Sequence, residues 1–392
     1  MRILYGVQGT GNGHITRARA MRLALEDLDA DVDYLFSGRS VDRYFDMAEF
    51  GSCAYLAGLT LVTVNGRVSY SKTILHNSYR QFVRDVKTLD LNQYSLVITD
   101  FEPVTAWSGM LRGKTVISLG HQPAFDYAIP KAGADLRSAM LMKVFAPGHV
   151  KVGMHWSSFD APLLPPMMEL PAENLSVAQP RKVLVYLPFE NESSVLEILT
   201  QIKTHEFFVY GVRSDVVHDG HVHIRPPSVS GFRADLESCS AVIGNAGFEL
   251  ASECLAHGKR LIVKPVERQM EQLSNALALK QLGYAEVTTN LDARSVTQWL
   301  HEDRAAPKLV CPDVAAALAS WIDEGDFRQA SLDRLSTDLW NRTHCQWTRH
   351  QNGVSVSREE TIRSITGQGT KPAEAARVLA CNSRQDASTL NA

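Results

Sequence analysis

The chain has 392 residues, 45% of them hydrophobic, which is enough for two or three domains with sizeable cores. Its formal net charge of −3 argues against nucleic acid as a partner. The six cysteines form no CxxC pair, so reduced thiols in a cytoplasmic protein are the simplest interpretation. Met1 leads straight into a predicted strand, and no apolar run approaches the roughly 18 residues that span a membrane. We therefore expect a cytoplasmic protein without a signal peptide.

A glycine-rich turn joins the first predicted strand, residues 2–7, to the first predicted helix, residues 15–28. The turn, Gly9 to His14, reads GTGNGH, and this strand–turn–helix order is typical of a doubly wound α/β domain. Its third glycine comes too early for the dinucleotide pattern GxGxxG, and no acidic residue ends the second predicted strand, residues 32–37. We therefore exclude a nicotinamide or flavin site and predict no cofactor.

Two short runs contain residue types that bind metals. Asp31 and Asp33 precede the second strand, whereas the ligands of an open sheet gather at the carboxyl ends of its strands. His218, His221 and His223 lie in a predicted loop that leads into a strand. We interpret both runs as solvated surface and predict no metal site, with metal binding by the three histidines as the alternative.

Polar residues follow two buried strands in the first half of the chain. Strand 95–99 leads into Asp100 to Pro103 (DFEP), and strand 114–119 leads into Gly120 to Pro123 (GHQP). Both clusters fall where an open sheet presents its binding residues. The structural alternative is that Asp100 caps a helix that begins at Pro103.

The segment Leu136 to Phe145 (LRSAMLMKVF) is apolar and carries Arg137 and Lys143. It predicts either an ordinary core helix or an amphipathic patch that meets anionic lipid at the inner face of the cell membrane. A peripheral membrane contact therefore stays open beside the core-helix interpretation.

A proline-rich linker over residues 161–181 divides the chain. We predict an N-terminal domain over residues 1–160 and a second α/β unit over residues 182–345. Helices are predicted from about residue 314 to residue 351, and the last of them could cross back to the first domain. The small, polar tail, residues 366–392, is expected to be mobile.

The stretch from Gly244 to Ala276 carries the strongest functional pattern. A strand runs into the small-residue turn Gly244 to Gly247, a helix follows from Phe248 to Gly258, and a second strand ends at Pro265. Glycine lets a ligand approach the backbone, and the first N–H groups of a helix attract a phosphate. Glu253 lies further along the helix, within reach of sugar hydroxyls. The structural alternative is a tight turn followed by a surface glutamate.

This stretch resembles the nucleotide-sugar half of GT-B glycosyltransferases, including the group that adds N-acetylglucosamine to lipid-linked muramyl-peptide. The residues that carry the resemblance are Gly247, Glu253, Gly258, Pro265, Gln272, Asn275 and Ala276. Arg260 replaces the usual proline, and Glu271-Gln272 replaces the usual His-Gln pair. That variant, DFEP and the His-Gln after the strand 114–119 are similar to a poorly characterised bacterial and archaeal glycosyltransferase subfamily.

The resemblance implies an α/β GT-B fold, with two Rossmann-like domains facing each other across a cleft. It implies metal-independent sugar transfer from a nucleotide-diphosphate donor, UDP-sugar favoured, to a hydroxyl acceptor such as a lipid-linked or cell-envelope precursor. The implied donor-binding residues are Gly244, Asn245, Ala246, Gly247, Phe248, Glu253, Glu271, Gln272, Asn275, Phe232 and Arg233. The implied catalytic bases are His14 and, second, His121. The phosphate-facing loop is Gly11, Asn12 and Gly13, and the acceptor-side residues are Asp100, Glu102 and Gln122.

Two other functions remain compatible with this pattern. The first is the non-hydrolysing 2-epimerisation of UDP-N-acetylglucosamine, which needs further acids and bases in the cleft. The second is a catalytically silent nucleotide-binding protein, which would bind UDP without turning over any donor.

Overall fold

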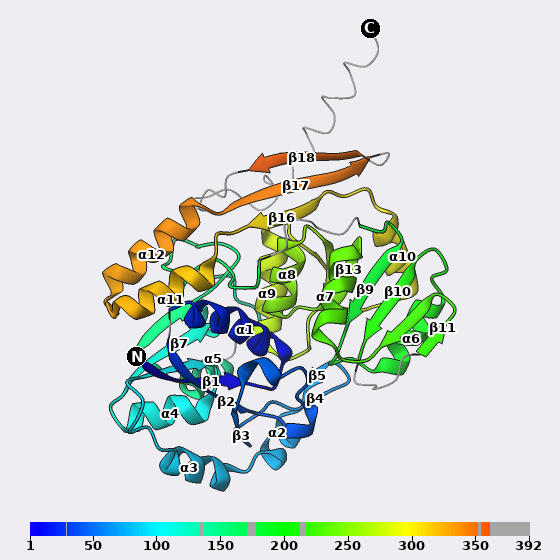
Figure 1. Cartoon of the computed structure of the whole chain (residues 1–392). Coiled ribbons are helices and arrows are strands. Elements are labelled where there is room, and N and C mark those ends of the chain that lie inside the picture. The colour runs from blue at the N-terminus through cyan, green and yellow to red at the C-terminus, as the bar shows by residue number, and fades with distance from the viewer. Residues whose placement is uncertain (29, 134–135, 171–177, 212–216, 352–353, 361–392) are drawn as a thin grey trace.

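The computed structural model describes the chain except for residues 29, 134–135, 171–177, 212–216, 352–353 and 361–392. It contains two α/β domains whose sheets face each other, with a small antiparallel sheet above the second domain (Figure 1). The predicted mobile tail, 366–392, falls outside the described residues.

The N-terminal domain is built on a six-stranded parallel sheet. Its strands, in spatial order, are β3 (Ala54–Leu56), β2 (Asp31–Ser37), β1 (Arg2–Gln8), β6 (Leu96–Asp100), β7 (Thr115–Gly120) and β8 (Val150–Gly153). The α-helices of this half are α1 (Asn12–Glu26), α2 (Tyr70–His76), α3 (Tyr79–Thr88), α4 (Pro103–Leu111) and α5 (Leu136–Phe145). Short 3-10 turns are η1 (Val41–Arg43), η2 (Ala48–Phe50) and η3 (Gln122–Asp126).

The C-terminal domain is built on a seven-stranded sheet. Its strands, in spatial order, are β11 (Val217–Asp219), β12 (Val222–Arg225), β10 (Glu206–Tyr210), β9 (Lys182–Tyr186), β13 (Ala241–Asn245), β14 (Arg260–Lys264) and β15 (Glu286–Val287). Only β11 is antiparallel to its neighbour among these described strands. The helices are α6 (Glu192–Thr200), α7 (Val229–Ser238), α8 (Phe248–Ala256), α9 (Met270–Gln281) and α10 (Ala293–His301). The two doubly wound domains confirm the predicted GT-B fold class.

The end of the chain differs from the prediction. Two helices, α11 (Val314–Glu324) and α12 (Gln329–Asn341), are followed by a strand rather than by further helix. This strand, β17 (His344–Gln351), pairs with β16 (Ala306–Val310) and β18 (Val354–Glu360) in an antiparallel sheet. The helical prediction to residue 351 was wrong because the backbone of β17 bonds to a strand that lies far away in sequence.

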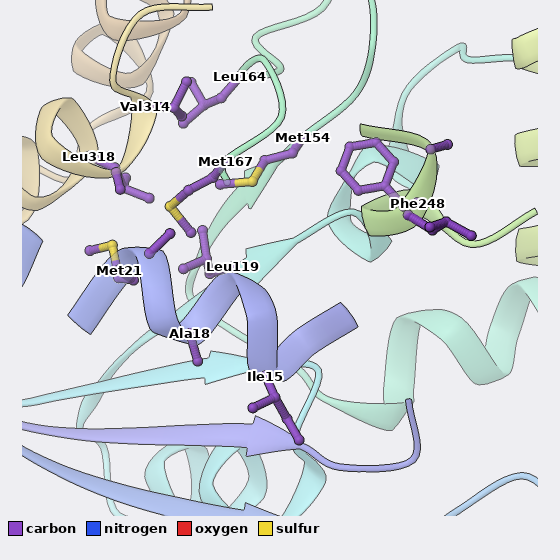
Figure 2. Packing of buried hydrophobic residues seen from close by; sticks show 14 of the residues in the cluster. Ile15, Ala18, Met21, Leu119, Met154, Leu164, Met167, Phe248, Val314 and Leu318 are labelled. Carbon is purple, nitrogen blue, oxygen red and sulfur yellow. The ribbon is translucent and has the colours of Figure 1, made fainter. Parts of the chain in front are cut away.

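The first residues of the predicted linker pack in the core. Leu163, Leu164 and Met167 are buried. Figure 2 shows Leu164 beside Val314, at the start of α11, and Met167 between Leu318 and α1. The carbonyl oxygen of Leu163 accepts hydrogen bonds from Ser336 Oγ at 2.7 Å and Trp340 Nε1 at 2.6 Å. The final helices therefore cross back and pack on the first domain, as predicted, and one hydrophobic cluster joins both domains.

The helices that follow the two glycine turns begin differently from several others of the scaffold. Asn191, Ser228, Asp292 and Asp313 cap α6, α7, α10 and α11 through side-chain oxygens that accept backbone N–H groups. In contrast, α1 and α8 begin at Gly11 and Gly247, which have no side chain to cap them. Their first N–H groups are left for another partner.

Candidate functional site

A cavity of about 580 Å³ lies between the two domains at the carboxyl ends of their sheets. Both glycine turns reach it, so segments more than 200 residues apart contribute to one surface. The predicted site residues that line it are Gly11, Asn12, Gly13, His14, His121, Gln122, Asn245, Gly247, Phe248, Glu271 and Gln272.

The starts of α1 and α8 meet across this cavity. At both Gly11 and Gly247 an added Cβ would have no atom of the described residues within 4 Å. At Gly13, by contrast, a Cβ would lie 2.8 Å from Glu249 Cγ, so the turn of α1 packs directly on the first turn of α8. Two helix N-termini with open space beside their caps provide positive electrostatic potential to an anionic ligand.

His14 is held by a buried carboxylate. Its Nδ1 lies 2.7 Å from Asp100 Oδ1, and Asp100 is fully buried at the end of β6. Burial acts to raise the pKa of Asp100, but Arg17 and His14 lower it below the usual value. A carboxylate at this distance favours the tautomer with the proton on Nδ1, which leaves Nε2 as the acceptor. Asp100, predicted on the acceptor side, therefore lies behind His14.

Arg17 joins this pair to the second domain. Its Nε donates to Asp100 Oδ2 at 2.7 Å and its Nη2 donates to Asp100 Oδ1 at 2.6 Å. Its Nη1 donates to Glu249 on α8. Arg17 is fully buried, so the bidentate contact fixes Asp100 and the third bond ties the two helix starts together.

Glu249 was not predicted as a site residue. It is the second residue of α8, only 6% of its surface is exposed, and burial raises its pKa to about 8. One carboxylate oxygen, Oε2, is buried without a hydrogen-bond partner among the described residues. The available signal was an acidic residue two positions after the glycine cap, where a phosphate was expected.

Phe101 is a second residue that the sequence did not single out. It follows β6 with φ of +54°, an unusual conformation for a residue other than glycine. Its ring stacks between Phe145, at a centroid distance of 4.7 Å, and His14, at 6.2 Å. Strained backbone of this kind clusters at functional sites, and here it places an aromatic ring beside the candidate base.

The position of His121 does not fit a second catalytic base. The side chain is fully buried, with Nδ1 2.9 Å from the Met154 carbonyl oxygen and Nε2 2.7 Å from Asn275 Oδ1. Burial lowers the pKa of His121, and its ring stacks on Phe248 at 4.2 Å. Both nitrogens are engaged, so neither is available to a substrate proton.

Asn275 and Phe248 are likewise turned away from a ligand. Asn275 Nδ2 donates to the Ala246 carbonyl oxygen at 3.0 Å, so its amide links His121 to the turn before α8. Figure 2 shows Phe248 pointing into the interior, where it stacks on Trp156. Neither side chain is therefore placed for the direct donor contact that was predicted. Both instead support the turn before α8, and Gly244 precedes this turn in β13.

Glu102 does not reach the cavity. Its carboxylate accepts from the backbone N–H groups of Val104 and Thr105, at 2.9 and 2.6 Å, and from Ser37 Oγ at 2.6 Å. The residue is fully buried as the N-cap of α4, and burial raises its pKa. The cap of the helix that begins at Pro103 is therefore Glu102, not Asp100 as the structural alternative had it. The prediction that Glu102 lies on the acceptor side does not fit the structure.

Hydrogen bonds fix three polar residues of the cavity wall. Gln122 Nε2 donates to Glu271 Oε1 at 3.1 Å, across the two domains. Gln272 Oε1 accepts from the Val266 backbone at 2.9 Å. Asn245 Nδ2 donates to Glu190 Oε1 at 3.1 Å. Gln122, Gln272 and Asn245 all line the cavity, so these bonds limit the directions in which their side chains can point.

Phe232, Arg233 and Glu253 lie beside the cavity rather than in its wall. Tyr186, which does line the cavity, has its ring 5.5 Å from that of Phe232 and its hydroxyl 3.1 Å from Asn12 Nδ2. Burial raises the pKa of Glu253 to about 7, and Arg233 opposes that rise. Tyr186 therefore connects the cavity to the region predicted to hold the nucleoside.

A largely apolar part of the wall comes from the N-terminal domain. It includes Leu61, Thr63, Val68, Tyr70, Leu141, Met142 and Phe145. Part of it belongs to a hairpin, β4 (Thr63–Val64) and β5 (Arg67–Val68), that reaches the other domain. Gly66 N–H donates to the Phe189 carbonyl oxygen at 2.6 Å, and Glu267 N–H donates to the Gly66 carbonyl oxygen at 2.7 Å. The hairpin therefore bridges the cleft.

The metal interpretations receive no support. In the part of the chain that the structure describes, no group of three or more His, Cys, Asp or Glu side chains could hold an ion. Asp31 and Asp33 pair with Arg2 at 3.3 and 3.1 Å, at the amino ends of the strands.

None of the described helices is long and apolar enough to cross a membrane.

Comparisons with known proteins agree with this architecture. A family model described as glycosyl transferase family 1 matches residues 1–302. No curated protein matches the chain significantly.

Solved structures share the fold at low identity. The glycosyltransferase of kitacinnamycin is 14% identical, covers 87% of this chain and 95% of its own, and superposes with a TM-score of 0.50. SnogD from Streptomyces nogalater is 17% identical, with 86% and 96% covered and a TM-score of 0.48. MurG of Acinetobacter baumannii is 14% identical, with 76% and 89% covered and a TM-score of 0.45. Membership of the muramyl-peptide group or of the proposed subfamily stays a prediction.

Proposed function

The chain belongs to glycosyl transferase family 1 and is a glycosyltransferase, and on that premise we propose that it moves a sugar from a nucleotide-diphosphate donor, UDP-sugar favoured, to a hydroxyl acceptor. The observation that carries the proposal is the Asp100–His14 pair at the start of α1, opposite the open start of α8. A base and an anion site thus face one cavity.

The proposed step uses both helix starts. The acceptor hydroxyl gives its proton to His14 Nε2, while its oxygen attacks the anomeric carbon of the donor sugar. The bond from that carbon to the phosphate oxygen breaks, and the nucleoside diphosphate leaves with the electron pair. Asp100 stabilises the imidazolium that forms, and the N–H groups at Gly247 and Phe248 stabilise the leaving diphosphate. Because these groups can carry the charge, we propose transfer without a metal.

The rest of the donor is assigned by position. The region of Phe232, Arg233 and Glu253 would take the nucleoside, with Glu253 on the ribose hydroxyls. Glu271 and Gln272, which line the cavity, would contact the sugar. Tyr186 supports the nucleoside assignment because it borders both the cavity and the ring of Phe232.

An apolar, lipid-linked acceptor is supported by the wall of the cavity. Three residues of α5, Leu141, Met142 and Phe145, line the cavity, while Met140, Leu141 and Val144 expose apolar surface on the same helix. An apolar surface continuous with the cavity would let a lipid-linked hydroxyl reach His14 from a membrane. The protein would then be cytoplasmic and bind the inner face of the membrane peripherally.

The proposed contact with a membrane can be tested separately. Vesicles with anionic phospholipid should co-sediment wild-type protein, and the double change Met140→Ser with Val144→Ser should weaken that binding. Leu111→Ser serves as the matched control, because Leu111 is also exposed but lies on α4 and not in the cavity wall. Equal binding of all three proteins would remove the membrane contact from the proposal.

The donor site is tested by thermal unfolding with UDP, dTDP, GDP and UDP-sugars. A nucleotide present at about 100 times its dissociation constant should stabilise the fold by roughly 2.7 kcal/mol. Glu253→Ala should remove the shift, and Glu197→Ala, an exposed site on α6, should keep it. No shift with any nucleotide would contradict the proposed function.

Product analysis separates the two alternatives. Release of a 2-epimer from UDP-N-acetylglucosamine without any acceptor would identify an epimerase. A nucleotide shift without donor turnover, across an acceptor panel that includes lipid-linked hydroxyls, would identify a silent binding protein.

A further inference from the structure

The Glu249 carboxyl lies where a donor phosphate is expected. It belongs to the first turn of α8, next to the cap glycine, and its Cγ packs against Gly13 at the start of α1. It lines the cavity, and only 6% of its surface is exposed. An ionised carboxylate at this point would repel a diphosphate, so its protonation state decides how a donor can bind.

The surroundings of Glu249 do not supply a full counter-charge. Arg17 donates to Glu249 Oε1 through Nη1, but its Nε and Nη2 are already bonded to Asp100. One guanidinium therefore serves two carboxylates. The titratable and charged groups that face Glu249 are Arg17 and His14 from α1, Tyr5 from β1, Asp100 from β6 and Glu253 from α8 itself.

The second carboxylate oxygen, Glu249 Oε2, is buried and has no hydrogen-bond partner among the described residues. When the carboxyl is protonated, this oxygen is a hydrogen-bond donor whose acceptor must come from outside the protein. The combination of a raised pKa and burial keeps that proton at neutral pH.

We propose that Glu249 binds the donor as a neutral carboxylic acid, and that its Oε2–H donates a hydrogen bond to an oxygen of the donor diphosphate. This inference rests on the proposed function and adds a donor contact to it. Arg17 holds the other oxygen, Oε1, so Oε2 is the oxygen that remains to carry the proton and donate it. The same contact makes donor binding proton-linked, because ionised Glu249 would offer a lone pair and a negative charge instead.

The test is the affinity of UDP and of dTDP measured by titration calorimetry from about pH 7 to about pH 9. For a group with a pKa of about 8, roughly one-tenth is neutral at pH 9, so wild-type affinity should fall about tenfold over this range. Glu249→Gln keeps a neutral side chain with an N–H donor, and its affinity should stay nearly constant. Glu197→Gln removes an exposed carboxylate on α6 and should behave as wild type.

The outcomes separate this inference from the function on which it rests. If UDP or dTDP binds but wild type and Glu249→Gln show the same pH profile, the proposed role of Glu249 is wrong while the donor site stands. The same conclusion follows if Glu249→Gln loses affinity at every pH, because Glu249 then acts as an anion or as a link to Arg17. If neither nucleotide binds wild type at any pH, the proposed function and this inference both fail.

Discussion

The starts of α1 and α8 have the same backbone arrangement but present different side chains. Each follows a parallel strand, begins at a glycine cap without a capping side chain, and has open space beside that cap. Yet α1 presents His14, held by a buried aspartate from another strand, whereas α8 turns Phe248 inward and leaves Glu249 at the cavity. The backbone makes both turns suitable for anions, and the side chains in the first turn of each helix decide whether it supplies a base or only binds.

His14→Ala should have the largest effect, because it removes the reactive group of α1 and leaves α8 unchanged. Loss of a general base lowers rates by about 10²–10⁴-fold, so we expect that decrease in sugar transfer with nucleotide affinity nearly unchanged. Initial rates and calorimetry on the same samples check this, with His301→Ala, an exposed histidine at the end of α10, as the control. Transfer at the wild-type rate in His14→Ala would contradict the assignment of the base.

Valine at each cap glycine should separate the two turns. Both caps have extended backbone that accepts valine, with φ of −73° at Gly247 and −122° at Gly11. Gly247→Val would fill the space next to the first N–H groups of α8 and should weaken nucleotide binding by about tenfold, or about 1.4 kcal/mol. Gly11→Val should lower transfer more than it lowers nucleotide affinity. Equal loss of nucleotide affinity in both variants would mean that the diphosphate contacts both turns.

The ligand-free protein should become less stable with rising pH because of Glu249. The folded-state pKa of about 8 lies above the model-compound value of 4.5, so the folded state binds more protons between these pH values. The contribution of this group to stability is therefore present at low pH and is lost as pH rises towards 8. At pH 8, Glu249→Gln should be more stable than wild type by up to about 4 kcal/mol in urea unfolding, with no difference near pH 4. A constant difference at all pH values would exclude this titration.

Changes at the opposite edge of the N-terminal sheet should have the smallest effect. Asp33 pairs with Arg2 and accepts from the Tyr94 hydroxyl at the amino ends of the strands, away from both glycine turns. Because the ion pair is partly exposed, Asp33→Asn should change stability by no more than about 1 kcal/mol. Transfer rates should not change, with or without a chelator. A strong loss of rate in this variant or with chelator would reopen the metal interpretation.

The elements that make the cavity were predictable from local sequence. Strand, glycine turn and helix occur in order at residues 2–28 and 241–256, and these patterns predicted the local structure around Gly11, His14 and Gly247. The prediction that the two domains face each other across a cleft came from the resemblance, because local patterns do not specify how domains are arranged.

The contacts that give the site its chemistry were not predictable in the same way. Arg17 lies 83 residues from Asp100 and 232 residues from Glu249, so no local pattern joins them. His121 and Glu102 carried plausible residue types at the right edge of the sheet, but burial and complete hydrogen bonding gave them structural roles. The strand β17 was missed for the same reason, because its partner β16 begins 38 residues earlier.

The hairpin β4–β5 has a consequence for how substrates enter and leave. It touches the second domain through main-chain groups: Gly66 with Phe189 and Glu267, and the Val68 N–H with the Glu267 carbonyl oxygen at 3.1 Å. At Gly66, φ is +73° and a Cβ would lie 2.4 Å from the Glu190 carboxylate, so only glycine fits at this position. Separation of the domains must break these bonds, so amide hydrogen exchange at Gly66, Val68 and Glu267 reports each opening of the cleft. Slow exchange there with ligand bound would make release of the spent nucleotide, rather than bond formation, the step that sets turnover.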